Sequence, residues 1–215
     1  MGTFPSAYLV ARLTRAEEVI RAARRGTSEG DAHVLIDKYV SKVWGSVSAA
    51  LDVLKGLAFG LAAKYAGHLP APWLAAVGVL VVVGHSFPFY LHPFAGRGLS
   101  AASGVLLALL PLGMVVAGVI IVLGYVTRAT GPATTAGFAL TPFVAILQGE
   151  RGAIAVMAAS IFGVILLRRL PGVGEAASIS GWPVALVRRL VFDSDSPSRR
   201  RSPASDSPHE RPVQP

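Results

Sequence analysis

The stretch GLSAASGVLLALLPLGMVVAGVIIVLGYVT, residues 98–127, contains no charged side chain over 30 residues. A transmembrane helix needs about 17–25 predominantly apolar residues, so this run is long enough to cross a bilayer. Further uncharged runs cover residues 65–96, 129–149 and 152–167. The chain is 53% apolar and 15% charged, whereas a soluble domain carries about 25% charged residues. The sequence therefore predicts an all-α, polytopic membrane helix bundle and excludes a soluble two-domain enzyme.

The run 98–127 is too long for one straight crossing, because 30 residues of α-helix extend about 45 Å. Either the helix tilts strongly or it is a hairpin broken near Pro111. Positively charged residues collect on the cytoplasmic side of membrane proteins. The hairpin places six arginines on one side, whereas a single crossing separates them. These are Arg97, Arg128, Arg168, Arg169, Arg188 and Arg189.

With this hairpin the sequence predicts six membrane helices. Their expected positions are 44–65, 73–91, the two arms of 98–127, and segments near 133–148 and 153–169.

Three regions follow from this assignment. Residues 1–43 are expected to be a cytoplasmic N-terminal segment with a short surface helix at 16–25. Residues 44–192 form the membrane bundle and end in an amphipathic, interfacial segment at 180–192. The tail 193–215 has six serines and five prolines in 23 residues, a composition typical of disorder.

Charge and cysteine content narrow the possible partners. The net charge is +8, and residues 46–192 hold nine basic and three acidic side chains. This excess favours anionic lipid headgroups or a phosphorylated substrate over nucleic acid, although the positive-inside rule alone also explains much of it. The chain has no cysteine, which excludes disulfides, Fe–S clusters and thiolate zinc sites.

Asp52 and Lys55 lie three residues apart in LDVLKG, residues 51–56, and so share one face of a helix. Charges inside a membrane span are costly and normally face the bundle interior. Two interpretations stay open: an ion pair that locks two helices, or the polar lining of a substrate cavity.

A second polar region runs from Gly84-His85 to the turn Gly96-Arg97-Gly98. Glycines let backbone N–H groups approach an anion, and the N-terminus of the following helix favours negative charge. Arg97 can then pair with a phosphate. The alternatives are a plain turn with one arginine, and a His85 that only packs between helices.

In combination these motifs resemble the bacterial membrane acyl-phosphate:glycerol-3-phosphate acyltransferases, the PlsY family. LDVLKG is followed by GHSFP at 84–88 and then by the glycine turn, and Thr127-Arg128 matches the opening of a later family motif. The resemblance covers about residues 2–175. Because residues 2–5 look like the end of the family's first transmembrane helix, we expect this chain to lack most of that helix.

The resemblance implies an enzyme of bacterial phospholipid biosynthesis that makes lysophosphatidic acid. Its expected partners are acyl phosphate, glycerol 3-phosphate and membrane lipids, without a cofactor or metal. Its expected location is the inner (plasma) membrane, with the site and the C-terminus in the cytoplasm. By this analogy the catalytic residues are Thr27, Ser28, His85 and Arg97, and the substrate-binding residues are Asp52, Lys55, Gly84, Gly96, Gly98, Thr127 and Arg128.

Departures from the family pattern leave other functions open. The family's first motif, Ser-Gly-Asn-x-Gly-Ala-Thr-Asn, falls on GTSEGDAH at 26–33, where both asparagines are lost and Glu29 and Asp31 are introduced. Carboxylates beside a dianionic phosphate repel it. The family's loop lysine is Arg97 here. A catalytically impaired paralog that binds lipid or phosphate is therefore one alternative, and a small transporter or scaffold is another.

Overall fold

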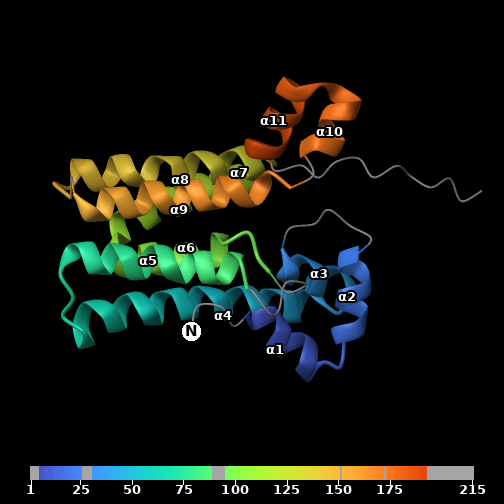
Figure 1. The fold of residues 1–215 in the computed structure, drawn as a ribbon, viewed down its shortest axis with the longest axis horizontal. Helices are drawn as coiled ribbons and strands as arrows, with labels where there is room; N and C mark the ends of the chain where they lie inside the picture. Colours follow the sequence, from blue (N-terminus) through green and yellow to red (C-terminus); the bar gives the residue numbers. More distant parts are fainter. Residues whose placement is uncertain (1–4, 26–30, 89–94, 151, 172, 193–215) are drawn as a thin grey trace, which may run out of the picture.

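The helices of the chain run side by side in a long bundle, with smaller helical units at one end (Figure 1). The computed structural model describes residues 5–25, 31–88, 95–150, 152–171 and 173–192, and every regular element in these ranges is helical, as predicted. The elements are α1 Ser6–Leu13, α2 Glu17–Arg25, α3 Ala32–Tyr39, α4 Lys42–Leu61, the π-helical turn η1 Ala62–Ala66, α5 Ala71–Ser86, α6 Leu99–Leu109, α7 Pro111–Val126, α8 Thr130–Leu147, α9 Ala153–Arg169, α10 Val173–Ser180 and α11 Trp182–Leu190.

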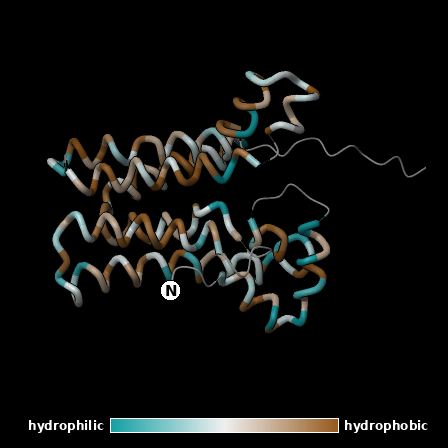
Figure 2. Tube along the Cα trace, viewed as in Figure 1, coloured by the Kyte–Doolittle hydropathy of each residue, from teal (hydrophilic) through white to brown (hydrophobic). Residues whose placement is uncertain are grey.

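Six helices, α4 to α9, correspond to the six predicted membrane helices. The continuous helix Lys42–Ala66, 25 residues long, and α8, 18 residues long, have the length and composition to cross a membrane, and α5, α6 and α7 are shorter apolar helices. Hydrophobic residues extend along the bundle, whereas hydrophilic residues gather at its ends and around α2 (Figure 2).

The run 98–127 forms the predicted hairpin. Leu110 leaves the helical conformation (φ −143°, ψ 64°) and Pro111 starts α7, because the residue before a proline is disfavoured in the α region. The two arms find different partners, since α6 packs mainly on α4 and α7 mainly on α8. The chain therefore returns at Arg128 to the end of the bundle that it left at Arg97 (Figure 1).

Helices α4 and α6 approach closely because glycines line their contact. A side chain at Gly56 would collide with the carbonyl of Ala101, and one at Gly104 would collide with the carbonyl of Val53. Small residues at helix contacts let backbones approach in membrane proteins, where van der Waals packing drives association. This contact fixes α4, which carries Asp52, against α6, which begins at the glycine turn.

The N-terminal helices α1, α2 and α3 pack around their own apolar cluster, which includes Val10, Ile20 and Ile36. The predicted surface helix at 16–25 is confirmed as α2. Helices α1, α3 and α10 were not expected from the sequence. Each is only eight residues long, so their stability comes mainly from packing on neighbours. The predicted disordered tail 193–215 lies outside the described residues.

Candidate active site

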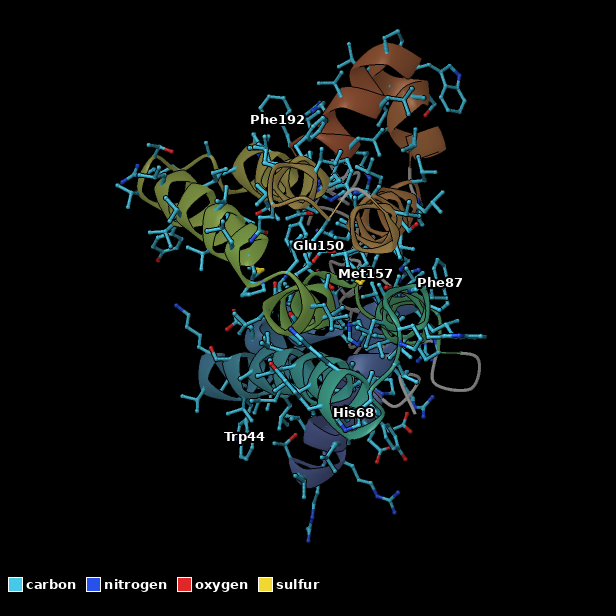
Figure 3. The ribbon with its side chains drawn as sticks, turned by 90° about the vertical axis from the view of Figure 1, so that its left-hand side faces the viewer. Trp44, His68, Phe87, Glu150, Met157 and Phe192 are labelled. Atoms are coloured by element: carbon cyan, nitrogen blue, oxygen red, sulfur yellow. The ribbon has the colours of Figure 1, made fainter. Side chains whose placement is uncertain are left out.

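The glycine turn lies at the end of the bundle next to α1–α3. Figure 3 views the molecule from the opposite end, where His68 and Glu150 are labelled. Residues 95–98 are buried, and Gly98 has φ +90°, a left-handed conformation that glycine adopts without strain. Its carbonyl accepts from Ala102 N at 2.8 Å and so starts α6. The turn thus presents the positive end of the α6 dipole to the site.

Three arginines from separate parts of the chain surround this turn. Arg24 Nη2 in α2 donates to the carbonyl of Ala95 at 2.7 Å. Arg168 Nε at the end of α9 donates to the carbonyl of Gly96 at 3.2 Å. Arg97 belongs to the turn itself, and only 7% of its surface is exposed. Three cations around one helix N-terminus make this the natural place for an anion to bind.

Asp31, next to the start of α3, already places a carboxylate on this turn. The backbone N–H of Arg97 donates to its Oδ1 at 2.5 Å, and its Oδ2 lies 3.8 Å from Arg97 Nε. Asp31 is 5% exposed. Its carboxylate therefore uses the same amide and guanidinium groups that a phosphate would use.

Asp52, Lys55 and His85 form one polar network behind the turn. Asp52 Oδ1 accepts from Ser6 Oγ at 2.8 Å and from Lys55 Nζ at 3.0 Å. His85 Nδ1 lies 3.3 Å from the same oxygen and 3.2 Å from Lys55 Nζ. The network therefore ties α1, α4 and α5 together, which supports the structural interpretation of the Asp52–Lys55 pair.

The network also reaches the glycine turn through the other edge of His85. A side chain at Gly96 would collide with Nε2 of His85, so the imidazole packs directly against the turn. His85 is 5% exposed and Asp52 is 2% exposed. The position of the turn thus depends on the ion pair behind it.

Of the remaining predicted site residues, the structure describes Gly84, Thr127 and Arg128. Thr127 and Arg128 are at the same end of the bundle but are exposed, and the Thr127 hydroxyl donates to the carbonyl of Leu123 at 2.9 Å. Gly84 is half-buried in the last turn of α5. Thr27 and Ser28 lie outside the described residues. The structure thus brings together Asp52, Lys55, His85, Gly96, Arg97 and Gly98.

Three residues of this region were missed from the sequence: Ser6, Arg24 and Ser86. Ser6 and Arg24 act on partners 46 and 71 residues away, so no local pattern could reveal them. Ser86 is fully buried, and its hydroxyl has no hydrogen-bond partner within the described ranges. A side chain at Gly98 would lie 2.6 Å from this hydroxyl, which places Ser86 beside the start of α6. In the same ranges no group of three His, Asp or Glu side chains could hold a metal ion.

The family model for glycerol-3-phosphate acyltransferase matches residues 1–172. The chain belongs to this family. A glycerol-3-phosphate acyltransferase of Prochlorococcus marinus is 28% identical over 169 residues, which cover 77% of this chain and 83% of that protein. One from Rubrobacter xylanophilus is 32% identical over 158 residues, covering 70% and 73% of the two chains.

Solved structures of PlsY, an integral membrane glycerol 3-phosphate acyltransferase, share this fold. The lysophosphatidic acid form aligns with a TM-score of 0.66 at 20% identity and covers 84% of this chain and 87% of that chain. The glycerol 3-phosphate form aligns with a TM-score of 0.63 at 21% identity, covering 82% and 90%. The acyltransferase-family fold of this chain is therefore that of an integral membrane protein, as the uncharged runs predicted.

Proposed function

We propose that this protein is a membrane acyltransferase that transfers an acyl chain from acyl phosphate to glycerol 3-phosphate, giving lysophosphatidic acid and inorganic phosphate. Membership of the glycerol-3-phosphate acyltransferase family supports the reaction class. The observation that carries the site assignment is the convergence of Arg24, Arg97 and Arg168 on the turn at the N-terminus of α6. Both substrates are phosphorylated, so each needs such a cationic site.

The chemistry requires positioning more than a covalent nucleophile. Acyl phosphate is a mixed anhydride, so its carbonyl carbon is already activated for attack by the glycerol 3-phosphate hydroxyl. The new ester C–O bond forms, the C–O bond to phosphate breaks, and the hydroxyl proton leaves with the phosphate. Holding two reactants together and stabilising developing charge are the main means of acceleration.

The residues divide into those that hold phosphate and those that support them. The guanidinium and backbone N–H of Arg97, together with the amides of Gly96 and Gly98, hold one phosphate, and Arg168 adds charge beside them. Thr127 and Arg128, exposed at the next turn, bind a second anion by turning inward, and Thr27 and Ser28 supply hydroxyls. Asp52, Lys55 and His85 keep the turn in place.

The membrane orientation follows from the same arginines. The six arginines that the hairpin prediction placed on one side lie at or beyond the end of the bundle that carries the turn. Lys64 lies near the end of the Lys42–Ala66 helix, at the other end of the bundle. The positive-inside rule places the arginine end in the cytoplasm of the inner membrane. The phosphorylated substrates are then drawn from the cytoplasm.

A catalytically impaired paralog is the second candidate, and the position of Asp31 favours it. Its carboxylate already accepts the Arg97 N–H at 2.5 Å, so a phosphate must displace it before it can bind. In this alternative the site still binds phosphate or lipid headgroups but does not catalyse acyl transfer.

Transfer is tested with the full chain reconstituted in lipid, acyl phosphate and labelled glycerol 3-phosphate. We expect labelled lysophosphatidic acid from the wild type and its loss in Arg97→Ala. Equilibrium binding of labelled glycerol 3-phosphate is measured on the same samples. Binding without product would support the impaired paralog, and neither binding nor product would rule out both candidates.

A further inference from the structure

The helical pair α10–α11 lies past residue 172, where the family match ends. The acyltransferase assignment therefore gives this pair no role. In Figures 1 and 3 it projects sideways from the bundle end that carries the glycine turn, next to α8 and α9. Since the bundle helices cross the membrane, a unit beside their ends lies at the level of the membrane surface.

The pair is held firmly to the bundle by polar contacts at the end of α11. Arg169 Nη1 donates to the carbonyl of Leu190 at 2.6 Å, and the Thr135 hydroxyl lies 3.0 Å from the carbonyl of Val191. Arg189 Nη2 donates to the carbonyl of Pro171. A side chain at Gly131 would collide with the carbonyl of Phe192, so α8 and the end of α11 are in direct contact, where Figure 3 labels Phe192. The outward face of α11 therefore has a fixed orientation.

That outward face is apolar with one cation beside it. Val184, Val187 and Val191 follow each other at intervals of three and four residues, and they are 49%, 49% and 36% exposed. This spacing puts them in one stripe along the helix. The exposed Arg188 flanks the stripe, and α11 contains no acidic residue. An amphipathic helix with basic residues is typical of segments that lie in the membrane interface.

A surface hollow of about 400 Å³ opens on the same face. It is lined by Pro183, Val184, Val187, Arg188 and Phe192. The lining is apolar, and Arg188, which contributes its aliphatic stem to it, carries the positive charge of this exposed face. An apolar hollow with a cation on the same face matches one kind of molecule that the surroundings supply, a phospholipid with its acyl chain next to its phosphate. We propose that α11 lies in the membrane interface and binds an anionic phospholipid in this hollow, with the acyl chain on the valines and Phe192 and the headgroup at Arg188.

The proposal is tested with a single tryptophan placed in the hollow. The chain has three tryptophans, so Trp44, Trp73 and Trp182 are changed to Phe and Phe192 is changed to Trp. The protein is reconstituted in phosphatidylcholine bilayers that contain a minor fraction of brominated phosphatidylglycerol or of brominated phosphatidylcholine. Bromine on an acyl chain quenches only tryptophans that it contacts.

We expect the tryptophan at position 192 to be quenched by both lipids, with about fivefold enrichment of the anionic lipid. Arg188→Gln should abolish this preference and leave quenching by phosphatidylcholine unchanged. Val187→Asp should reduce quenching by both lipids. In a matched control Trp73, at the far end of α5 and 65% exposed, is the only tryptophan and should not respond to either substitution.

Two results would overturn the proposal. Absence of quenching at position 192 would mean that water or another protein covers this face. Equal quenching by the two brominated lipids with Arg188 present would show that Arg188 does not select an anionic headgroup. Because Arg188 and Val187 are exposed, these substitutions should leave the packing of the bundle intact, and the thermal unfolding temperature of each variant checks this.

Discussion

Replacing Asp31 with Ala should tighten the binding of glycerol 3-phosphate, even though it removes an ordered polar contact. Asp31 Oδ1 accepts the N–H of Arg97 at 2.5 Å, and Oδ2 lies 3.8 Å from Arg97 Nε. A phosphate that binds the same groups must first displace this carboxylate. The substitution removes the competitor and its negative charge together.

The expected magnitude follows from the energy of the contact that is lost. A hydrogen bond to a charged group contributes about 1.5–3 kcal/mol. Taking about 2 kcal/mol as the cost of displacing Asp31, the dissociation constant should fall about 30-fold. Asp31→Asn keeps an acceptor without the charge, so its effect should be intermediate. Asp31 makes no side-chain cap hydrogen bond, so α3 should still form. Loss of the carboxylate beside the buried Arg97 should nevertheless lower the unfolding temperature.

The assay is equilibrium binding of labelled glycerol 3-phosphate without acyl phosphate, so that no turnover occurs. Asp37→Ala is the matched control, since it removes one exposed carboxylate from the same helix. It should change the dissociation constant by less than about twofold, because exposed charges are strongly screened. An unchanged or weakened affinity in Asp31→Ala, measured at a temperature where its unfolding curve shows the protein folded, would contradict this competition between Asp31 and phosphate.

Four further substitutions test the supports of the turn and the topology. Gly98→Ala should cost about 1–2 kcal/mol of unfolding free energy and lower the unfolding temperature, because φ is +90° and Ser86 Oγ would lie 2.6 Å from the new side chain; an unchanged unfolding temperature would contradict this. Asp52→Asn removes the buried negative charge that Lys55 and His85 contact and should cost about 3 kcal/mol, seen as a large loss of thermal stability; a loss under 1 kcal/mol would contradict the network. The chain has no cysteine, so Arg128→Cys and Lys64→Cys can each be labelled alone with an impermeant thiol reagent. The hairpin predicts that the two positions react from opposite sides of the membrane, and reaction of both from the same side would refute it.

The hairpin could be predicted because its signals are local. Pro111 interrupts an uncharged run of 30 residues, and the charges at its two ends belong on the same side of a membrane. The pairing of Asp52 with Lys55 is equally local, since three residues of helix bring them together. The glycine turn was also recognisable, because the conformation of Gly98 and the start of α6 depend on neighbouring residues.

Contacts between distant segments could not be predicted in this way. Asp31 and Arg97 are 66 residues apart. The sequence shows that a carboxylate at position 31 would repel a phosphate, but it does not show that Asp31 contacts Arg97. Arg24 reaches the turn only because α2 packs against the bundle end. The role of Thr127 and Arg128 was predicted from a motif match. Their side chains are exposed in the structure, and their part in substrate binding stays a prediction.

By the proposed function, the arginine-lined turn at the start of α6 is the site of acyl transfer. The most direct measurement is the rate at which reconstituted protein forms lysophosphatidic acid and inorganic phosphate from acyl phosphate and glycerol 3-phosphate. We predict equal amounts of the two products, loss of both in Arg97→Ala, and a wild-type rate in Lys64→Ala, a change of an exposed cation at the other end of the bundle. A wild-type rate no higher than that of Arg97→Ala would contradict the claim.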